Sequence, residues 1–521
     1  MKTLSYYIFG VLVAILFIGI GCSKNSIDKP IYGTQSNETF YKTDGDIESA
    51  LTSAYLQLRI TWTEYSLYKH FLGDITTDDA WKGGANDADN SDLMNLTTFT
   101  VYPTNSVVNT FWTILYDLVN RANDVIYYGP NATGDTVLIR RYINEAKLLR
   151  AFGYYNLATL YGGVPLVLHP LNSSEAVNTP RSSAEDVFKQ IVTDLNDAAS
   201  LPTKNEYADA DKYRVSSGFA YALLGKTYMF QGDYSNAAKA LQQVVESGVY
   251  DLLPEYGDNW NIDNSKESVF EIPAIMTSNK TLSLGSNVPH YFTTRNTTNY
   301  QGYGFDAPTQ DLYNEFDADD PRITYTFTRT GDEYLQDVAV QDNSGSPDGY
   351  YNRKTEVPYY KRIGYDPWMV SYNSRVIRYS DIMLLYAESL NETGNASQAL
   401  IYLNQVRKRA RESNPVDPDR EKQTYVPGTN TATTLPDITT TNQSELRQDI
   451  WHERRCELAM EGWRRDDLIR QNRFGTVMKA FATKYNTSKG KNFTDSRDNL
   501  LPIPQNEIDY TNGVITQNTG Y

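Results

Sequence analysis

The sequence predicts a mainly α-helical protein, in which a scaffold of tetratricopeptide-like helix pairs carries a large insertion of loops and short strands. Two segments share one pattern of small and large apolar residues at helical spacing, and further segments have one apolar helical face. Between the two matching segments, residues 250–378 are instead rich in Asn, Thr, Gly and Pro, which favour turns and loops. A chain of 521 residues can bury a core large enough for such a scaffold.

The first helix pair is predicted at residues 217–245. Gly225 and Ala237 are small residues that allow two antiparallel helices to approach closely, while Tyr228 and Leu241 would fill the space between them. A Gly-Asp pair between the two helices predicts a tight turn. These spacings are typical of a tetratricopeptide repeat.

A second segment, which begins at Leu384, repeats the same offsets. The matching positions are Ala387, Leu390, Ala399, Leu403 and Val406. Residues 143–161 and, more weakly, residues 46–58 are also predicted to be helical. Because one helix pair cannot bury its own apolar face, we expect several pairs to stack.

The insertion between the two repeats contains short runs typical of strands, at residues 268–272 and 323–328. Residues 414–442 are rich in Thr and Pro without periodicity and are predicted to form a surface loop. The predicted organisation is a signal segment (1–21), an N-terminal helical region (22–230) and a C-terminal region (250–521), which comprises the ligand-presenting insertion (250–378) and a closing helical part (379–521).

The N-terminus has the features of an export signal. An uncharged apolar run at residues 8–20 follows Lys2; it is short for a membrane span and suits a secretory signal. The small residues before Cys22 resemble the lipobox of bacterial lipoproteins, so Cys22 is the predicted lipidation site; a plain signal peptide is the alternative.

If Cys22 carries lipid, Cys456 has no disulfide partner. Cys456 is predicted to be an inert buried thiol, rather than a nucleophile activated by His452.

Charge balance and the scarcity of reactive motifs exclude several functional classes. The chain has 64 acidic and 48 basic residues and a net charge of −16, which argues against binding to nucleic acid or to an anionic membrane surface. Its four histidines are scattered, and no His-Glu-x-x-His, Gly-x-Ser-x-Gly or Walker-type motif occurs. We therefore predict no catalytic residue, cofactor or metal site, although residues 87–92 hint at a calcium loop that lacks its turn glycine.

The most highly charged helical segment carries three carboxylates at intervals of four residues. Glu453, Glu457 and Glu461 share one helix face and are interleaved with arginines. An acid/base pair or a metal site is one interpretation. The interpretation we favour is structural: the charged residues of this segment pair with Arg378, Asp381 or neighbouring helices, because the segment is charge-balanced and metal clusters normally include histidine.

Several segments, in the expected order along the chain, resemble the SusD/RagB family of outer-membrane, glycan-binding lipoproteins. They are residues 27–30 after the cysteine, 150–155 with 161–166, Asp317 with 320–322, 378–381 with 387–388, 450–470, and 501–504 with 517–521. The resemblance extends over essentially the whole chain.

The resemblance implies a function as well as a fold. A member of this family would be a non-enzymatic lipoprotein of the outer membrane, facing the exterior, that captures oligosaccharides and delivers them to a SusC-like TonB-dependent transporter. Capture of peptides by the same scaffold is an alternative, as is a glycan hydrolase, because two carboxylates across a cleft suffice for that chemistry.

Carbohydrate recognition needs aromatic rings for the apolar face of a pyranose and polar side chains for its hydroxyl groups. The chain contains 41 Tyr, and three loop segments combine such rings with polar groups: residues 74–92, 290–305 and 350–372. Most aromatic residues pack in cores, so only some of these rings are expected to face a ligand. The predicted glycan-binding residues are Asp78, Trp81, Asn86, Tyr291, Tyr300, Tyr303 and Trp368.

Overall fold

The computed structural model describes residues 40–60, 64–276, 284–295, 302–329, 332, 345–357, 370–415, 427–430 and 434–521. The predicted signal segment with Cys22, the predicted ligand residues Tyr300 and Trp368, and most of the central part of the 414–442 loop lie outside these described residues. The remaining predictions can be compared with the structure.

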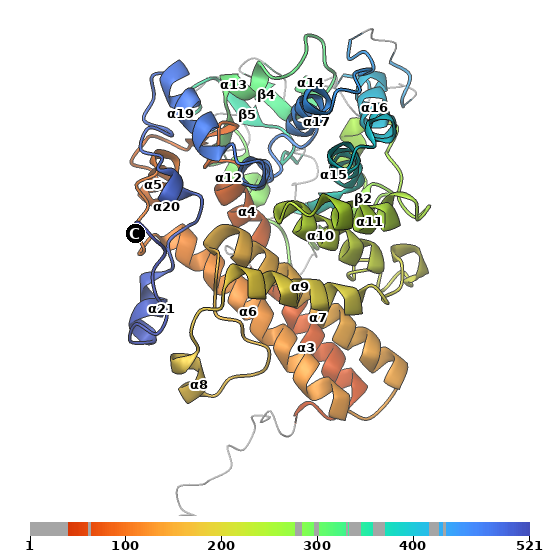
Figure 1. Ribbon diagram of the computed structural model, residues 1–521, viewed down its shortest axis with the longest axis vertical. Coiled ribbons are helices and arrows are strands. Elements are labelled where there is room, and N and C mark those ends of the chain that lie inside the picture. The colour runs from red at the N-terminus through yellow and green to blue at the C-terminus, as the bar shows by residue number, and fades with distance from the viewer. Residues whose placement is uncertain are drawn as a thin grey trace, which may run out of the picture.

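A series of packed helices forms the scaffold (Figure 1). Along this series α6 packs on α7, α7 on α9, α9 on α10, α10 on α11, α11 on α15, and α15 on both α16 and α17, while α3 packs on α6 and α7. The bounds are α3 (Asp44–Gln57), α6 (Ser106–Tyr128), α7 (Thr136–Tyr161), α9 (Ala184–Ala198), α10 (Ser217–Phe230), α11 (Tyr234–Val245), α15 (Tyr379–Glu392), α16 (Ala396–Glu412) and α17 (Gln443–Glu457).

Shorter helices lie around this scaffold. They are α4 (Tyr65–Gly73), α5 (Ser91–Thr98), α8 (Ser173–Asn178), α12 (Val288–Phe292), α13 (Gln310–Tyr313), α14 (Ile323–Thr326), α18 (Arg464–Arg470), α19 (Phe474–Lys484), α20 (Asp495–Asp498) and α21 (Gln505–Tyr510), with 3₁₀ turns at Gly129–Asn131, Lys204–Glu206 and Tyr256–Trp260. None of the helices in the described part of the chain is long and apolar enough to cross a membrane.

The two predicted helix pairs are confirmed. In the first pair, α10 and α11, a Cβ atom added to Gly225 would lie 2.3 Å from Leu241 Cδ2, so the close approach requires glycine. In the second pair, α15 and α16, the predicted packing residues Ala387 and Leu403 are fully buried. The weaker predictions at residues 143–161 and 46–58 are also correct, since these segments lie almost entirely in α7 and α3.

Three small antiparallel sheets accompany the helices, pairing β1 with β3, β2 with β6 and β4 with β5. The strands are β1 (Ala80–Gly83), β2 (Ser268–Ile272), β3 (Phe305–Pro308), β4 (Phe327–Arg329), β5 (Tyr350–Asn352) and β6 (Ser374–Arg378). The predicted strand at 268–272 is therefore confirmed as β2. The sheets β1–β3 and β2–β6 join segments that are far apart in the sequence, whereas β4 and β5 are near neighbours.

The predicted strand at residues 323–328 is only partly correct. Its first four residues form the helical turn α14, and the strand β4 begins at Phe327. The turn forms because the backbone of Arg322 is fixed beside Asp320, and its carbonyl oxygen accepts hydrogen bonds from the amide and the hydroxyl group of Thr326. Arg322 is itself held by long-range contacts with Glu453 and Glu457, so tertiary structure overrides the β-branched composition of the run.

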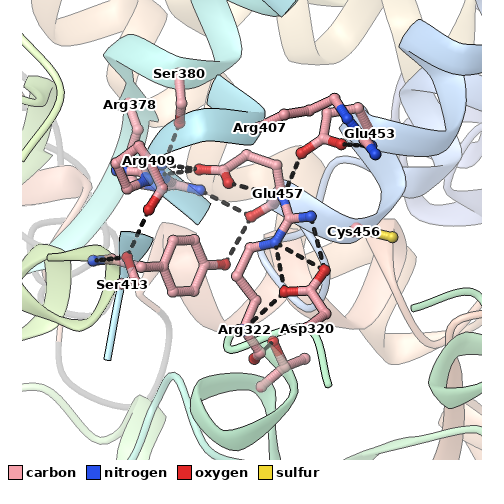
Figure 2. A network of polar contacts seen from close by, with 12 residues as sticks. Asp320, Arg322, Arg378, Ser380, Arg407, Arg409, Ser413, Glu453, Cys456 and Glu457 are labelled. Atoms are coloured by element: carbon pink, nitrogen blue, oxygen red, sulfur yellow. Dashed lines mark hydrogen bonds and ion pairs between the residues drawn. The ribbon is translucent and has the colours of Figure 1, made fainter. Parts of the chain in front are cut away.

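The charged face of α17 is buried in a network of ion pairs (Figure 2). Glu457 accepts hydrogen bonds from Arg378 at 2.9 Å, from Arg409 at 2.5 Å and from Arg322 at 3.2 Å. Arg322 also donates to Glu453, and so joins the insertion to the C-terminal helices. The predicted structural pairing with Arg378 is confirmed.

Cys456 lies on the same helix and is 1% exposed. Burial raises the pKa of its thiol well above the ordinary value, which disfavours the reactive thiolate. The prediction of a buried thiol is confirmed, although His452 Nε2 lies 4.0 Å from the sulfur.

Candidate functional site

Four segments of the chain surround an open groove of about 630 Å³. They are residues 81–87 at the end of β1, one side of α5, residues 345–347 and residues 485–489 after α19. Two of these segments, residues 81–87 and α5, belong to the N-terminal half, and the other two come from the insertion and the C-terminal part. The groove therefore exists only once the whole chain has folded.

Trp81 is fixed on the wall of this groove by three contacts. Its backbone pairs with Ala307 of β3, which sets the direction of the side chain. Its indole Nε1 donates a hydrogen bond to Asp348 Oδ2 at 2.5 Å, and its ring lies 5.4 Å from the ring of Phe481. Because the indole is only half-buried, part of it remains available to line the groove.

Tyr485 supplies a second aromatic ring to the groove. Its centroid lies 4.8 Å from that of Phe481, which is 3% exposed, and its hydroxyl group donates to Asp311 Oδ1 at 3.1 Å. Trp81 and Tyr485 thus pack on the same buried phenylalanine. We call these three residues the aromatic ledge.

The loop after β1 has its shape fixed by its own contacts. Gly83 and Gly84 have φ angles of 70° and 84°, and a Cβ atom on Gly83 would lie 2.0 Å from the carbonyl oxygen of Gly304. Lys82 is buried and donates from its Nζ to the carbonyl oxygens of Asn86 and Asp89. Lys82 therefore holds the loop in place rather than facing a ligand.

Polar groups form the rim of the groove. Asn86 is exposed, and its Oδ1 accepts hydrogen bonds from the amides of Ala88 and Asp89. These two bonds fix the plane of the side-chain amide and therefore the direction of its Nδ2 group. Asn486 and Ser488 are exposed on the opposite segment. Amide and hydroxyl groups of this kind can donate to and accept from sugar hydroxyl groups.

Asp78 does not belong to this groove. It is 2% exposed, and both of its carboxylate oxygens accept hydrogen bonds from Arg464, at 2.8 and 2.9 Å, while Arg455 lies 2.8 Å away. Burial opposes the charge, but the two guanidinium groups hold the pKa of Asp78 below its ordinary value. The sequence-based assignment of Asp78 to ligand binding is replaced by a structural role beneath β1.

The two described tyrosines of the second predicted loop also lie away from the groove. Tyr291 and Tyr303 are half-buried, their rings are 5.2 Å apart, and both contact Phe305 of β3. Burial raises the pKa of Tyr291 to about 12. The two rings pack against the core, and neither contributes to the groove wall.

The acidic loop at residues 87–92 uses its carboxylates locally. Asp89 Oδ2 accepts a hydrogen bond from the amide of Ala85, and Asp92 Oδ2 accepts from the amide of Ser106 at the start of α6. These carboxylates stabilise the loop and a helix end, which explains their clustering without a calcium ion.

Sequence reasoning missed Tyr485, Phe481 and Asp348. The segment that begins at Tyr485 reads Tyr-Asn-Thr-Ser-Lys-Gly, a ring followed by polar residues and a glycine, and this composition is the same signal that pointed to the loop of Trp81. Phe481 and Asp348 carry no such local signal, because their roles depend on contacts with Trp81 across long sequence separations.

Comparison with known families assigns nearly the whole chain. A model of the SusD family matches residues 266–521, and a second model, described as starch-binding and associating with the outer membrane, matches residues 34–229. A tetratricopeptide-repeat model matches residues 220–247, in the region of α10 and α11.

Individual proteins are similar over the same extent. SusD-like protein P2 of Formosa agariphila is 25% identical over 98% of this chain and 98% of its own length. The solved structure of a laminarin-binding SusD-like protein is 27% identical, with a TM-score of 0.74 over 92% of this chain and 100% of its own. Surface glycan-binding protein A from Bacteroides thetaiotaomicron, solved in complex with laminarihexaose, is 25% identical with the same TM-score and coverage. The helical scaffold, the motifs and these matches agree: the chain belongs to the SusD/RagB family.

Proposed function

We propose that this protein binds oligosaccharides in the groove beside the aromatic ledge, without chemically changing them. The observation that carries the proposal is the fixed, partly buried indole of Trp81 on the wall of an open groove whose rim presents Asn86 and Asn486. A pyranose can place its C–H face on such a ring while its hydroxyl groups bond to the rim. One similar protein of known structure binds laminarin and another was solved in complex with laminarihexaose, which supports a glucan or a related glycan as the ligand.

Replacement of Trp81 tests this proposal. In a chain that lacks residues 1–21, Trp81→Ala is expected to weaken binding to the tightest glycan of a polysaccharide panel at least about tenfold. Isothermal titration calorimetry and affinity gels measure the change. Tyr127→Ala is the matched control, because Tyr127 is 55% exposed on α6 and does not line the groove. If a folded Trp81→Ala variant bound the glycan as tightly as wild type, the groove beside Trp81 would not be the binding site.

The composition of the groove supports binding without catalysis. Among the described residues that line it, Asp87 is the one carboxylate, whereas most glycosidases act with two carboxyl groups across the scissile bond. We expect no new reducing ends when the panel is incubated with the protein. Released products that disappear in an Asp87→Asn variant would favour the hydrolase, and selective binding of peptides would favour peptide capture.

The proposed cellular role is delivery of the captured glycan to a SusC-like TonB-dependent transporter, from a lipid anchor on Cys22 at the outer-membrane surface. The lipobox-like sequence and the family description that names the outer membrane support this role. Mass spectrometry of the N-terminal peptide should detect the lipid on Cys22, and Cys22→Ser should release the protein from the membrane fraction. Affinity purification of the full-length protein should recover the transporter.

A further inference from the structure

Behind the sheet that carries Trp81, an imidazole and two carboxylates meet in the interior. His70 lies in the last turn of α4, Asp74 directly follows that helix, and Asp306 belongs to β3. His70 Nδ1 lies 3.0 Å from Asp74 Oδ2 and 3.4 Å from Asp306 Oδ2. Each residue offers one ligand atom, an imidazole nitrogen or a carboxylate oxygen, and these three atoms all lie within 4.8 Å of one another. We call these three residues the interior triad.

The interior triad carries more negative charge than its surroundings balance. Asp74 is 1% exposed and Asp306 is fully buried, and His70 is the one ion-pair partner of either carboxylate among the described residues. A further cation, Lys489, interacts electrostatically with Asp306, but its Nζ donates to the carbonyl oxygen of Ile75 and forms no ion pair with either carboxylate. Two buried carboxylates therefore share a single ion-pair partner, which is unfavourable in a medium of low dielectric constant.

The two carboxylates also have unused acceptor capacity. Asp74 Oδ1 and Asp306 Oδ1 are both buried and accept no hydrogen bond from the described residues. The other oxygen of each group is held: Asp74 Oδ2 accepts from the amide of Gly462 at 2.8 Å, and Asp306 Oδ2 accepts from Asn352 Nδ2 at 3.0 Å. Each carboxylate is thus oriented by an outer hydrogen bond while keeping free lone pairs, which is how outer-shell groups commonly prepare metal ligands.

We propose that the interior triad binds one divalent transition-metal ion of the zinc class. One imidazole nitrogen and two carboxylate oxygens are a ligand set that suits Zn²⁺, whereas Ca²⁺ and Mg²⁺ prefer oxygen ligands alone. The ion would supply the missing positive charge and occupy the free lone pairs. It would also join α4 to β3, the strand that pairs with β1 and so positions Trp81. This site was not predicted from the sequence and is separate from the glycan groove.

Metal titration of the full-length protein tests the site. The protein, purified in detergent on a tag without histidine and stripped with a chelator, is titrated with Zn²⁺ by calorimetry. We expect one ion per chain, with a dissociation constant of about 10⁻⁶ M or below, and a melting temperature about 2 °C or more above that of the chelated protein. Co²⁺ used as a probe should give visible ligand-field absorption with the wild type.

Variants distinguish this site from adventitious binding. His70→Ala and the isosteric Asp306→Asn should each weaken Zn²⁺ binding at least about tenfold and remove the Co²⁺ absorption, with circular dichroism confirming that they fold. His169→Ala is the matched control, because His169 is exposed and its Nδ1 lies beside the carbonyl oxygen of Pro170. The proposal is overturned if the wild type binds no Zn²⁺ below millimolar concentration, or if a folded Asp306→Asn variant binds it as tightly as wild type.

Discussion

At the scale of single residues, one hydrogen bond decides how Trp81 is presented. Asp348 Oδ2 accepts two hydrogen bonds, one from the indole Nε1 of Trp81 and one from the backbone amide of Gln310 at the start of α13. The carboxylate thereby ties the orientation of the ring to a helix end. An indole held in one orientation loses less conformational freedom when a sugar stacks on it. Asp348 is therefore a positioning residue for the proposed ligand.

Replacement of Asp348 should weaken binding without unfolding the protein. In Asp348→Ala the indole loses a charge-assisted hydrogen bond, and we expect glycan affinity to fall about three- to tenfold, less than in Trp81→Ala. Calorimetry measures affinity and thermal denaturation measures stability. Asp209→Ala, at an exposed aspartate distant in sequence from the groove segments, is the control. A loss of affinity as large as that of Trp81→Ala, or none at all, would contradict a positioning role.

Individual site residues could be predicted only where their signal is local. Trp81 and Asn86 stand out because a ring and amides follow one another in a glycine-containing loop. Asp78 lies in the same predicted loop segment, but its partners Arg455 and Arg464 are almost four hundred residues away in the sequence. A single sequence does not report such pairings, so a structural carboxylate was assigned to the ligand.

At the scale of elements, α17 is held by charge rather than by apolar packing alone. Glu453 and Glu457 contact arginines from the insertion, from β6 and from α16, so that one helix face connects three parts of the chain (Figure 2). A buried ion pair contributes little net stability, but removal of one partner leaves the other charge unpaired. The network therefore fixes the relative positions of these elements.

Glu457→Gln should destabilise the protein and change its response to acid. Although burial opposes the charge, Arg409, Arg378 and Arg322 lower the pKa of Glu457 to about 2. Its contribution to stability is therefore present above the unfolded pKa of about 4.3 and is lost as the pH falls towards 2. We expect the variant to lose about 3–5 kcal/mol at neutral pH, with a shallower loss between pH 4 and 2, measured by urea denaturation.

The control for this prediction is Glu185→Gln. Glu185 pairs with Lys189 on α9, but the side chains of this pair are 75% and 65% exposed, so its loss should change stability by less than about 0.5 kcal/mol. If Glu457→Gln proved equally harmless, the network would not fix the C-terminal helices.

Helices and their packing were predictable from the sequence where the spacing of small and large apolar residues indicates which residues meet. The contact between Gly225 and Leu241 could be predicted from their spacing, because the two helices of one repeat are close in the sequence. The segment that begins at Ile323 was not predictable in this way, because its first turn depends on the fixed position of Arg322 in the buried network. Local composition favoured a strand, and the tertiary contact determined the turn.

At the scale of the whole molecule, the scaffold and the groove have separate tasks. The helix series from α3 to α17 supplies the core (Figure 1). The groove is assembled from loops and short elements outside this series. Such a division lets the contacts around the ledge vary while the scaffold is retained. An open groove also suits a ligand that continues beyond the site at both ends, as a polysaccharide does.

A crystal structure of the protein with the oligosaccharide that binds most tightly in the panel tests the central claim most directly. We predict a pyranose ring with its C–H face on the indole of Trp81, in the groove between the segments of Asn86 and Asn486, and with all glycosidic bonds intact. A sugar bound elsewhere on the molecule, a cleaved ligand, or an empty groove at saturating oligosaccharide would contradict it.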